Sequence, residues 1–283
     1  MNSNLESVRS YYDTNVEDEW GRIAERPEFL LTCRMLDRYI HPGDKVLDIG
    51  GGPGRYSLYL AAKGCRVTLF DLSPVNAEFA LEKATEQKLS LNAIVGDARE
   101  ADTLLAEQFD HVLLMGPMYH LLEEDDRNRS VQAAINLLKP GGLIYIVFLN
   151  LVSGITYALQ HAPHYIASDL PSEIDFQTCF AEKRSFAGDA WTKAYFMEQN
   201  EILSVVGGLP LEKLHLFGQE GILSPFEKTI MAEPKEIIDL WLDYCERVWE
   251  REELFCLAEH LMYVGRKPII TDLDTGKEQE VVS

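Results

Sequence analysis

Apolar and polar positions follow a regular alternation through the first half of the chain. Five short apolar runs predict buried strands, at 45–49, 66–70, 92–95, 109–115 and 143–150. The segments between them carry apolar residues at helical spacing, as in the stripe formed by Val131, Ala134, Ile135 and Leu138. The near-continuous apolarity of 143–150 is typical of a parallel strand covered by helices on both faces. Residues 45–150 are therefore expected to form about five βα units of a doubly wound sheet.

The alternation stops on either side of this region. Residues 5–20 indicate a polar helix or arm that bears tyrosines, and Pro27 suits the first turn of a clearer helix. Residues 151–196 are aromatic and polar without a clean period, which is typical of a lid. Further along, the pattern predicts a helix at 197–207, strands at 211–217 and 260–265, and a long amphipathic helix or helix pair at 234–257. The polar residues 271–283 are expected to be disordered.

These patterns divide the chain into one elaborated α/β core and its additions. The expected parts are a helical arm or lid at 1–40, a nucleotide-binding core at 41–150, a substrate lid at 151–200, the rest of the core at 201–268 with a helical insertion at 219–257, and a disordered tail at 269–283. The Lys139-Pro140-Gly141-Gly142 stretch is expected to be a turn before the fifth strand.

The composition and net charge of the chain favour some kinds of binding partner over others. The 283 residues are 46% hydrophobic and 25% charged, as in an ordinary globular protein. No apolar stretch reaches the roughly 20 residues of a membrane helix, and five scattered cysteines without a Cys-x-x-Cys pair fit reduced thiols, so a cytoplasmic location is expected. The formal net charge of -20 disfavours nucleic acid and anionic membranes and favours a small or cationic substrate. The oligomeric state is left open, a homodimer included.

The most informative motif is the loop after the first strand. An apolar run ends in Asp48, and glycines follow at 50, 51, 52 and 54. A dinucleotide fingerprint needs a third glycine where this chain has Arg55 or Ser57, and no Lys-Ser/Thr pair follows to make a Walker loop. The loop therefore points to a different nucleotide ligand.

With this loop and four further motifs in order, the chain resembles the class I S-adenosylmethionine-dependent methyltransferases over roughly residues 40–150. The other motifs are Asp71 at the end of the second strand, Gly96-Asp97-Ala98 after the third, the 114–120 stretch after the fourth, and the 137–142 turn into the fifth. The resemblance implies a Rossmann-like, mostly parallel seven-stranded sheet with an antiparallel last strand, a helical N-terminal arm and lid insertions. It also implies S-adenosylmethionine as cofactor and S-adenosylhomocysteine as product.

The same resemblance implies a set of cofactor-binding residues. Asp48 and the loop glycines Gly50, Gly51, Gly52 and Gly54 would hold the methionine part. Asp71 would accept both ribose hydroxyls, with Leu72 beside it. Asp97 would accept the adenine amino group, the backbone N–H of Ala98 would face the ring, and Met115 would touch adenine while packing in the core.

The residues that act on the methyl acceptor are less constrained. Methyl transfer needs alignment and exclusion of water, and it needs a base only when the acceptor arrives protonated. His120 is the candidate base because it follows the fourth strand, at the edge where open α/β sheets bind ligands. His120 and Tyr119 are equally compatible with shaping the pocket. Asn150, at the end of the fifth strand, is a candidate for hydrogen bonding to substrate or for capping the turn there.

Two further groups of residues have both a functional and a structural interpretation. Tyr11, Tyr12 and Trp20 belong to the expected arm, where an aromatic ring can shield a sulfonium by a cation–π contact, and Arg26 or Arg34 is placed to meet the cofactor carboxylate. Ordinary packing and surface charge account for these residues equally well. His161 and His164 are three apart around Pro163 with no third ligand nearby, so a lid loop is favoured over a metal site and no metal is expected.

Four functions compete on this evidence. The favoured one is methyl transfer to a small molecule, since the chain is similar to bacterial methyltransferases of unassigned specificity. A methyltransferase acting on tRNA or protein is disfavoured by the acidic charge, and a nicotinamide oxidoreductase by Arg55 and Ser57. A catalytically silent, cofactor-binding regulatory subunit stays open. The acceptor atom and the pathway are not determined by the sequence.

Overall fold

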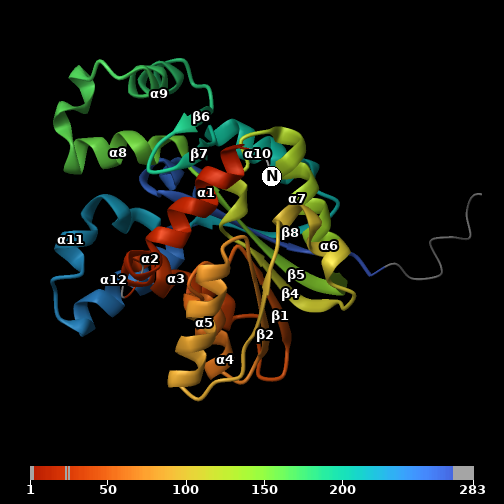
Figure 1. The fold of residues 1–283 in the computed structure, drawn as a ribbon. Coiled ribbons are helices and arrows are strands. Elements are labelled where there is room, and N and C mark those ends of the chain that lie inside the picture. The colour runs from red at the N-terminus through yellow and green to blue at the C-terminus, as the bar shows by residue number, and fades with distance from the viewer. Residues whose placement is uncertain (1–2, 23, 25, 270–283) are drawn as a thin grey trace, which may run out of the picture.

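The computed structural model describes residues 3–22, 24 and 26–269, and its centre is a seven-stranded sheet in the order β3-β2-β1-β4-β5-β9-β8 (Figure 1). The strands of this sheet are β1 (Lys45–Ile49), β2 (Arg66–Asp71), β3 (Asn92–Val95), β4 (Phe109–Leu114), β5 (Leu138–Leu149), β8 (Glu212–Gly218) and β9 (His260–Arg266). Strands β1 to β5 pair in parallel, whereas β9 runs antiparallel to both β5 and β8. The predicted Rossmann-like sheet with an antiparallel last strand is thus confirmed.

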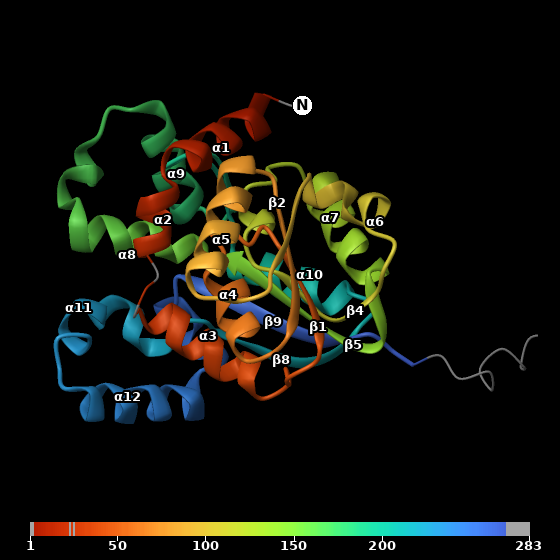
Figure 2. The same cartoon turned by 60° about the horizontal axis from the view of Figure 1, so that its bottom comes forward.

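Helices cover both faces of this sheet (Figure 2). The helices are α1 (Ser3–Thr14), α2 (Val16–Arg22), α3 (Pro27–Asp37), α4 (Arg55–Ala62), α5 (Pro74–Glu86), α6 (Ala101–Leu104), α7 (Glu124–Asn136), α8 (Leu151–His161), α9 (Pro171–Ala181), α10 (Gln199–Gly208), α11 (Glu227–Ile230) and α12 (Lys235–Val248). Short 3-10 turns are η1 (Ala98–Glu100), η2 (Pro117–Tyr119), η3 (Pro163–Ala167), η4 (Gly221–Phe226) and η5 (Glu252–Leu257). None of the described helices is long and apolar enough to cross a membrane.

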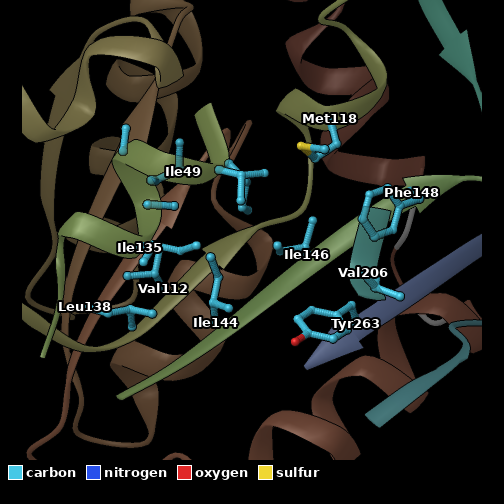
Figure 3. Packing of buried hydrophobic residues seen from close by; sticks show 14 of the residues in the cluster. Ile49, Val112, Met118, Ile135, Leu138, Ile144, Ile146, Phe148, Val206 and Tyr263 are labelled. Atoms are coloured by element: carbon cyan, nitrogen blue, oxygen red, sulfur yellow. The ribbon is translucent and has the colours of Figure 1, made fainter. Parts of the chain in front are cut away.

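Strand β5 shows why the sheet needs cover on both sides. Ile144, Ile146 and Phe148 belong to the core that includes α7 and α10, whereas Tyr145 and Val147 belong to the core that includes α3, α4 and α12. Successive side chains of a strand point to opposite faces, so an uninterrupted apolar run fills both cores. Figure 3 shows the first core, in which Val206 lies beside Phe148 and Tyr263.

The region 151–196, in which the sequence pattern predicted no individual helix or strand, is ordered. It forms α8, η3, α9 and an antiparallel hairpin of β6 (Phe186–Asp189) and β7 (Lys193–Phe196), seen in green at the top left of Figure 1. Its order comes from a small core of its own, in which the ring of Phe176 lies 5.0 Å from each of the rings of Phe186 and Phe196. The aromatic residues stabilise this segment by packing between positions that are far apart in the sequence. Such packing produces no hydrophobic periodicity from which helices or strands could be predicted.

Two smaller expectations also need correction, and a third lies outside the described residues. The 139–142 stretch is not a turn before β5 but lies within it, because Leu138 already pairs with Phe109 and the register then shifts between Phe109 and His111. The helix or helix pair expected at 234–257 is α12 followed by the 3-10 turn η5. The predicted tail falls outside the described residues from position 270 onward.

Candidate active site

The candidate site is a cavity along the edge of the sheet where the parallel strands end. Its floor comes from the ends of β1, β2 and β4, and its roof from α1 and α2. The lining residues used below are Leu5, Val8, Tyr12, Glu19, Arg22, Glu28, Asp48, Gly50, Gly51, Gly52, Asp71, Leu72, Asp97, Ala98, Met115, Tyr119, His120, Gln219 and His260. In open α/β sheets this edge is where ligands bind.

The loop after β1 is rich in glycine because neighbouring parts of the chain pack too close to it to leave room for side chains. A Cβ at Gly50 would lie 2.5 Å from Cδ of Pro117, so no side chain fits between the β1 and β4 loops. Gly54 has φ +87° and caps the start of α4, and a Cβ there would lie 2.9 Å from the Cβ of Ala80. Gly50, Gly51 and Gly52 line the cavity, but Gly54 does not, so its predicted contact with the cofactor is replaced by packing against α5.

Asp48 lies beneath this loop and is almost fully buried. The hydroxyl of Ser57 donates a 2.7 Å hydrogen bond to its carboxylate. Burial raises the pKa of Asp48 to about 6, with a further increase from the nearby charge of Asp71. A buried carboxylate with one hydrogen bond is a costly feature, and it is the pattern expected where a cation binds.

Asp71 organises the loop from the end of β2. Its Oδ2 accepts the N–H of Gly52 at 2.8 Å, and its Oδ1 accepts the N–H of Ser73 at 2.8 Å and the amide of Asn76 at 3.2 Å. Burial raises the pKa of Asp71, while these donors act to lower it. A carboxylate oxygen can accept more than one hydrogen bond, so lone pairs of Asp71 are left for a ligand.

The expected adenine end lies at the adjoining strand ends. Leu72, Ala98 and Met115 line the cavity. Asp97 lines it too, but its carboxylate is bound by Arg99, with Nη2 to Oδ2 at 2.6 Å and Nε to Oδ1 at 3.0 Å. Asp97 also caps η1 through the N–H of Arg99. An adenine amino group therefore competes with an existing ion pair for this carboxylate.

His120 is buried with both ring nitrogens engaged. Its Nδ1 lies 2.9 Å from the carbonyl oxygen of Lys193, which can only accept, so Nδ1 donates. Its Nε2 therefore accepts from the hydroxyl of Tyr12, at 2.7 Å. Burial lowers the pKa of His120 to about 4, so the ring is neutral. His120 joins the arm to the β6–β7 hairpin, whose Trp191 ring lies 5.9 Å away.

Several sequence candidates lie away from the cavity. Asn150 is buried and does not line the cavity, and its amide donates to the carbonyl oxygens of Phe255 and Ala258, at 2.9 and 3.2 Å, so it holds η5 in place. Arg26 forms a bidentate pair with Glu227, at 2.7 and 2.8 Å, and does not line the cavity.

The other arm candidates also have partners elsewhere. Arg34 pairs with Asp243 at 2.7 Å, and Tyr11 donates to Glu19 at 3.4 Å. The ring of Trp20 stacks on the guanidinium of Arg55, whose carbon lies 3.4 Å from the ring centroid. Of the three arm aromatics, Tyr12 alone lines the cavity within the described residues.

Sequence reasoning missed a buried group at the other end of the cavity, formed by Glu28, Glu220 and His260. Glu28 belongs to α3, Glu220 follows β8, and His260 begins β9. Oε1 of Glu220 lies 2.5 Å from Nδ1 of His260, and Oε2 accepts the backbone N–H of His260 at 3.0 Å. Because β9 runs antiparallel, its first residue lies at the same edge as the last residues of β5. The predicted antiparallel direction of the last strand was the signal that could have placed His260 at the cavity.

One ligand atom from each of these three residues lies within 4.8 Å of the other two, a spacing that suits a cation. The group already contains its own compensating charges. Arg22 reaches Glu28 at 3.4 Å, and the carboxylates of Glu220, Glu28 and Glu259 raise the pKa of His260 against the effect of burial. Arg22 therefore already supplies a positive charge to this group, and the trio is not assigned as a metal site.

Comparisons with known proteins agree with this geometry. Residues 46–142 match the family model described as "Methyltransferase domain". Over this segment the chain contains the domain of an S-adenosylmethionine-dependent methyltransferase. Its cofactor is accordingly S-adenosylmethionine. The matched segment runs from β1 to the first part of β5 and contains the glycine loop, Asp71 and Asp97.

Relatives of this methyltransferase cover most of its length. A ubiquinone biosynthesis O-methyltransferase of Xanthomonas campestris pv. campestris (strain B100) is 28% identical over 218 residues, which is 71% of this chain and 88% of the relative. The N-methyltransferase NodS of Bradyrhizobium japonicum WM9 superposes with a TM-score of 0.56 at 14% identity, covering 93% of this chain and 99% of that one. Magnesium protoporphyrin IX methyltransferase (ChlM) of Synechocystis PCC 6803 superposes with a TM-score of 0.56 at 15% identity, covering 93% of this chain and 99% of that one. At these identities the solved structures establish the shared fold.

Proposed function

We propose that this methyltransferase transfers the methyl group of S-adenosylmethionine to a small-molecule acceptor enclosed in the cavity. The observation that carries this proposal is the roof that α1 places over the site. Leu5, Val8 and Tyr12 of α1 line the cavity, and the first two are buried. An acceptor on RNA or protein would have to displace this helix, whereas a small molecule fits beneath it. The net charge of -20 also opposes an RNA acceptor.

The proposed cofactor contacts follow the order of strands across the sheet edge. Asp71 accepts the ribose hydroxyls, Gly50 to Gly52 let the methionine part lie against bare backbone, and Asp48 attracts its ammonium. Leu72, Ala98 and Met115 hold the adenine ring, with Asp97 contributing when Arg99 releases it. The bound cofactor supplies a methyl group that is already reactive, so the protein's task is to align the acceptor and exclude water.

With the adenosine over β2 and β3, the acceptor belongs at the other end of the cavity. That end is lined by Tyr119 and His120, which follow β4, and by His260, which begins β9. His120 acts there as a positioning residue, because its neutral ring ties Tyr12 of the roof to the hairpin. An oxygen acceptor is favoured by the relatives, whose printed names are O-methyltransferases.

Calorimetric titration with S-adenosylmethionine, S-adenosylhomocysteine and NAD on one preparation tests the cofactor site. We expect binding of the first two and none of NAD. A screen of small phenols, alcohols, amines and thiols with methyl-labelled S-adenosylmethionine then tests the acceptor class, with bulk tRNA and a protein mixture as comparison arms. Label appearing in RNA or protein, and not in small molecules, would overturn the proposal. Normal cofactor binding with no transfer to any arm would favour a silent regulatory subunit.

A further inference from the structure

The acceptor end of the cavity contains a histidine whose surroundings differ from those of His120. His260 lies within the cavity lining, and its side chain is about nine-tenths buried. Its Nδ1 and its backbone N–H are both held by the one carboxylate of Glu220, at 2.5 and 3.0 Å. Glu220 is itself fully buried, so this pair is shielded from water. The ring is therefore fixed in one orientation with Nδ1 toward Glu220.

The second ring nitrogen is free for a ligand. Within the described residues, Nε2 of His260 makes no hydrogen bond, whereas both ring nitrogens of His120 are occupied. A carboxylate on Nδ1 fixes the tautomer that carries its proton there and leaves a lone pair on Nε2. This is the arrangement by which a carboxylate orients a histidine base and stabilises the imidazolium that forms.

A second polar atom in the same part of the lining lacks a partner. The amide oxygen of Gln219, next to Glu220 in the chain, is buried without a hydrogen bond among the described residues. The amide nitrogen of Gln219 donates to the hydroxyl of Thr32 at 2.7 Å, which fixes the orientation of the side chain. A buried acceptor left unpaired is unfavourable unless a ligand supplies a donor.

The position of His260 across the sheet is the remaining requirement. The edge runs from Asp97 after β3, through Asp71 and the glycine loop, to Tyr119 after β4 and then to His260 on β9. The ring centroids of Tyr119 and His260 are 5.9 Å apart. With the adenosine over β2 and β3, as proposed, the part of the cavity left for the acceptor would be the part that His260 lines.

From this geometry we infer that His260, held by Glu220, is the base that takes the proton of a hydroxyl-bearing acceptor. The inference rests on the proposed function. As the acceptor oxygen forms its bond to the methyl carbon, the bond from that carbon to sulfur breaks and leaves its electron pair on sulfur. The hydroxyl proton passes to Nε2, and the resulting imidazolium is paired with the Glu220 carboxylate. Gln219 and Glu28 are placed to accept hydrogen bonds from other polar groups of the acceptor.

The charges around His260 fix the direction of its pH dependence. Glu220, Glu28 and Glu259 face the ring and raise its pKa, while burial lowers it. Arg22 of α2 and Arg26, which precedes α3, act on the same carboxylates and limit their effect. The base is active only when deprotonated, so kcat rises with pH through the raised pKa of His260. Removing the Glu220 charge moves this rise to lower pH.

The first experiment needs no acceptor. Imidazole nitrogen NMR on the protein saturated with S-adenosylhomocysteine follows the ring of His260, assigned by its loss in His260→Gln. We expect Nε2 to titrate and Nδ1 to keep its proton at high pH, and Glu220→Gln to lower the titration midpoint. A ring that keeps its proton on Nε2 at high pH would overturn the inference, while calorimetric binding of the cofactor would still support the proposed function.

The second experiment uses the best hydroxylated acceptor from the screen. His260→Gln is expected to lower kcat by about 100- to 10,000-fold with little change in the affinity for S-adenosylhomocysteine. Glu220→Gln is expected to lower kcat less and to shift the acid limb of its pH profile to lower pH. A purely structural role for Glu220 would leave that limb in place.

The chain supplies a matched control in a second histidine–carboxylate pair. His215 lies on β8, its Nδ1 is 2.6 Å from Oε1 of Glu250, and it does not line the cavity. His215→Gln should leave the pH profile unchanged. Wild-type kcat retained in His260→Gln, transfer restricted to amines or thiols, or activity that depends on added Mg²⁺ and is lost with a chelator would each contradict the inference.

Discussion

The two halves of the cavity are built in different ways. The cofactor half draws on Asp48, the glycine loop, Asp71 and Asp97, which lie within residues 48–98 and at the ends of three adjacent strands. The acceptor half brings together Tyr12, Glu28, His120 and His260, which come from the two ends and the middle of the chain. The first half is a local, repeated βα arrangement, whereas the second depends on how distant segments pack. A conserved chemistry and a variable specificity can thus be carried by separate parts of one cavity.

The two histidines of the acceptor half make the same point at the level of single residues. Burial without a carboxylate partner lowers the pKa of His120 to about 4, and Lys193 and Tyr12 occupy its ring nitrogens. Burial also acts to lower the pKa of His260, but the three carboxylates around that ring outweigh burial and raise it. Residue type and burial are the same, and the neighbours decide which ring is structural and which can take a proton.

The largest effect should come from the cofactor half. Asp71→Ala removes the acceptor proposed for two ribose hydroxyls, at about 1.5–3 kcal/mol for each charge-assisted hydrogen bond, so affinity for S-adenosylhomocysteine should fall by about 100- to 20,000-fold. Calorimetry measures this change. Asp71 also accepts the backbone N–H groups of Gly52 and Ser73, so its removal could disturb the loop. The variant Asp71→Asn is therefore measured as well, and circular dichroism checks that both variants are folded.

The matched control for Asp71 is Asp110 of β4. It lies at the opposite edge of the sheet, where it accepts from Lys45 and Lys139. Asp110→Ala should lower stability and leave cofactor affinity within about threefold of wild type, since no ligand contact is removed. An equal loss of cofactor affinity in Asp71→Ala and Asp110→Ala would contradict the assignment of the cofactor site to the edge that contains Asp71.

An intermediate effect is expected for His120 in acid. Its folded pKa of about 4 lies below the ordinary 6.5, so the unfolded chain binds the proton more tightly as pH falls. The stability that the neutral ring contributes is fully present above pH 6.5 and declines toward pH 4, by about 3 kcal/mol. Denaturant unfolding from pH 7 to pH 4 should show that His120→Gln, which can keep both hydrogen bonds, loses less stability than wild type. Parallel pH curves for the two proteins would contradict the assignment of a neutral, buried ring.

The smallest effect is expected at Asp48, beneath the cofactor half. Its pKa is raised from 3.8 to about 6, so the folded state holds a proton that the unfolded state has lost between these values. Above pH 6 the buried charge lowers stability, and Asp48→Asn should raise the free energy of unfolding at pH 8 by about 1–2 kcal/mol. The gain should vanish near pH 4, and affinity for S-adenosylmethionine should fall with the loss of the carboxylate. A variant that is no more stable at pH 8 would show that Asp48 is fully compensated in the fold.

Sequence patterns located the sheet and the cofactor half, and they failed in a consistent way elsewhere. The strands β1 to β4 were placed to within a residue, because each is an apolar run bounded by polar or glycine residues. No helix or strand was predicted within 151–196, since its helices are ordered by Phe176, Phe186 and Phe196, which meet across the sequence. The hydrogen bonds of Asn150 could not be predicted for the same reason, because its partners Phe255 and Ala258 lie more than a hundred residues away.

The sequence by itself determined the doubly wound sheet, the glycine loop and the strand-end acids Asp48, Asp71 and Asp97, because these depend on local periodicity and on backbone conformations that few residues adopt. Only the tertiary structure decided that His120 would be tied between the arm and the hairpin, and that His260 would meet Glu220 and Glu28 at the cavity. The physical reason is that a titratable group takes its properties from burial and from the charges around it, and those neighbours are brought together by folding rather than by proximity along the chain.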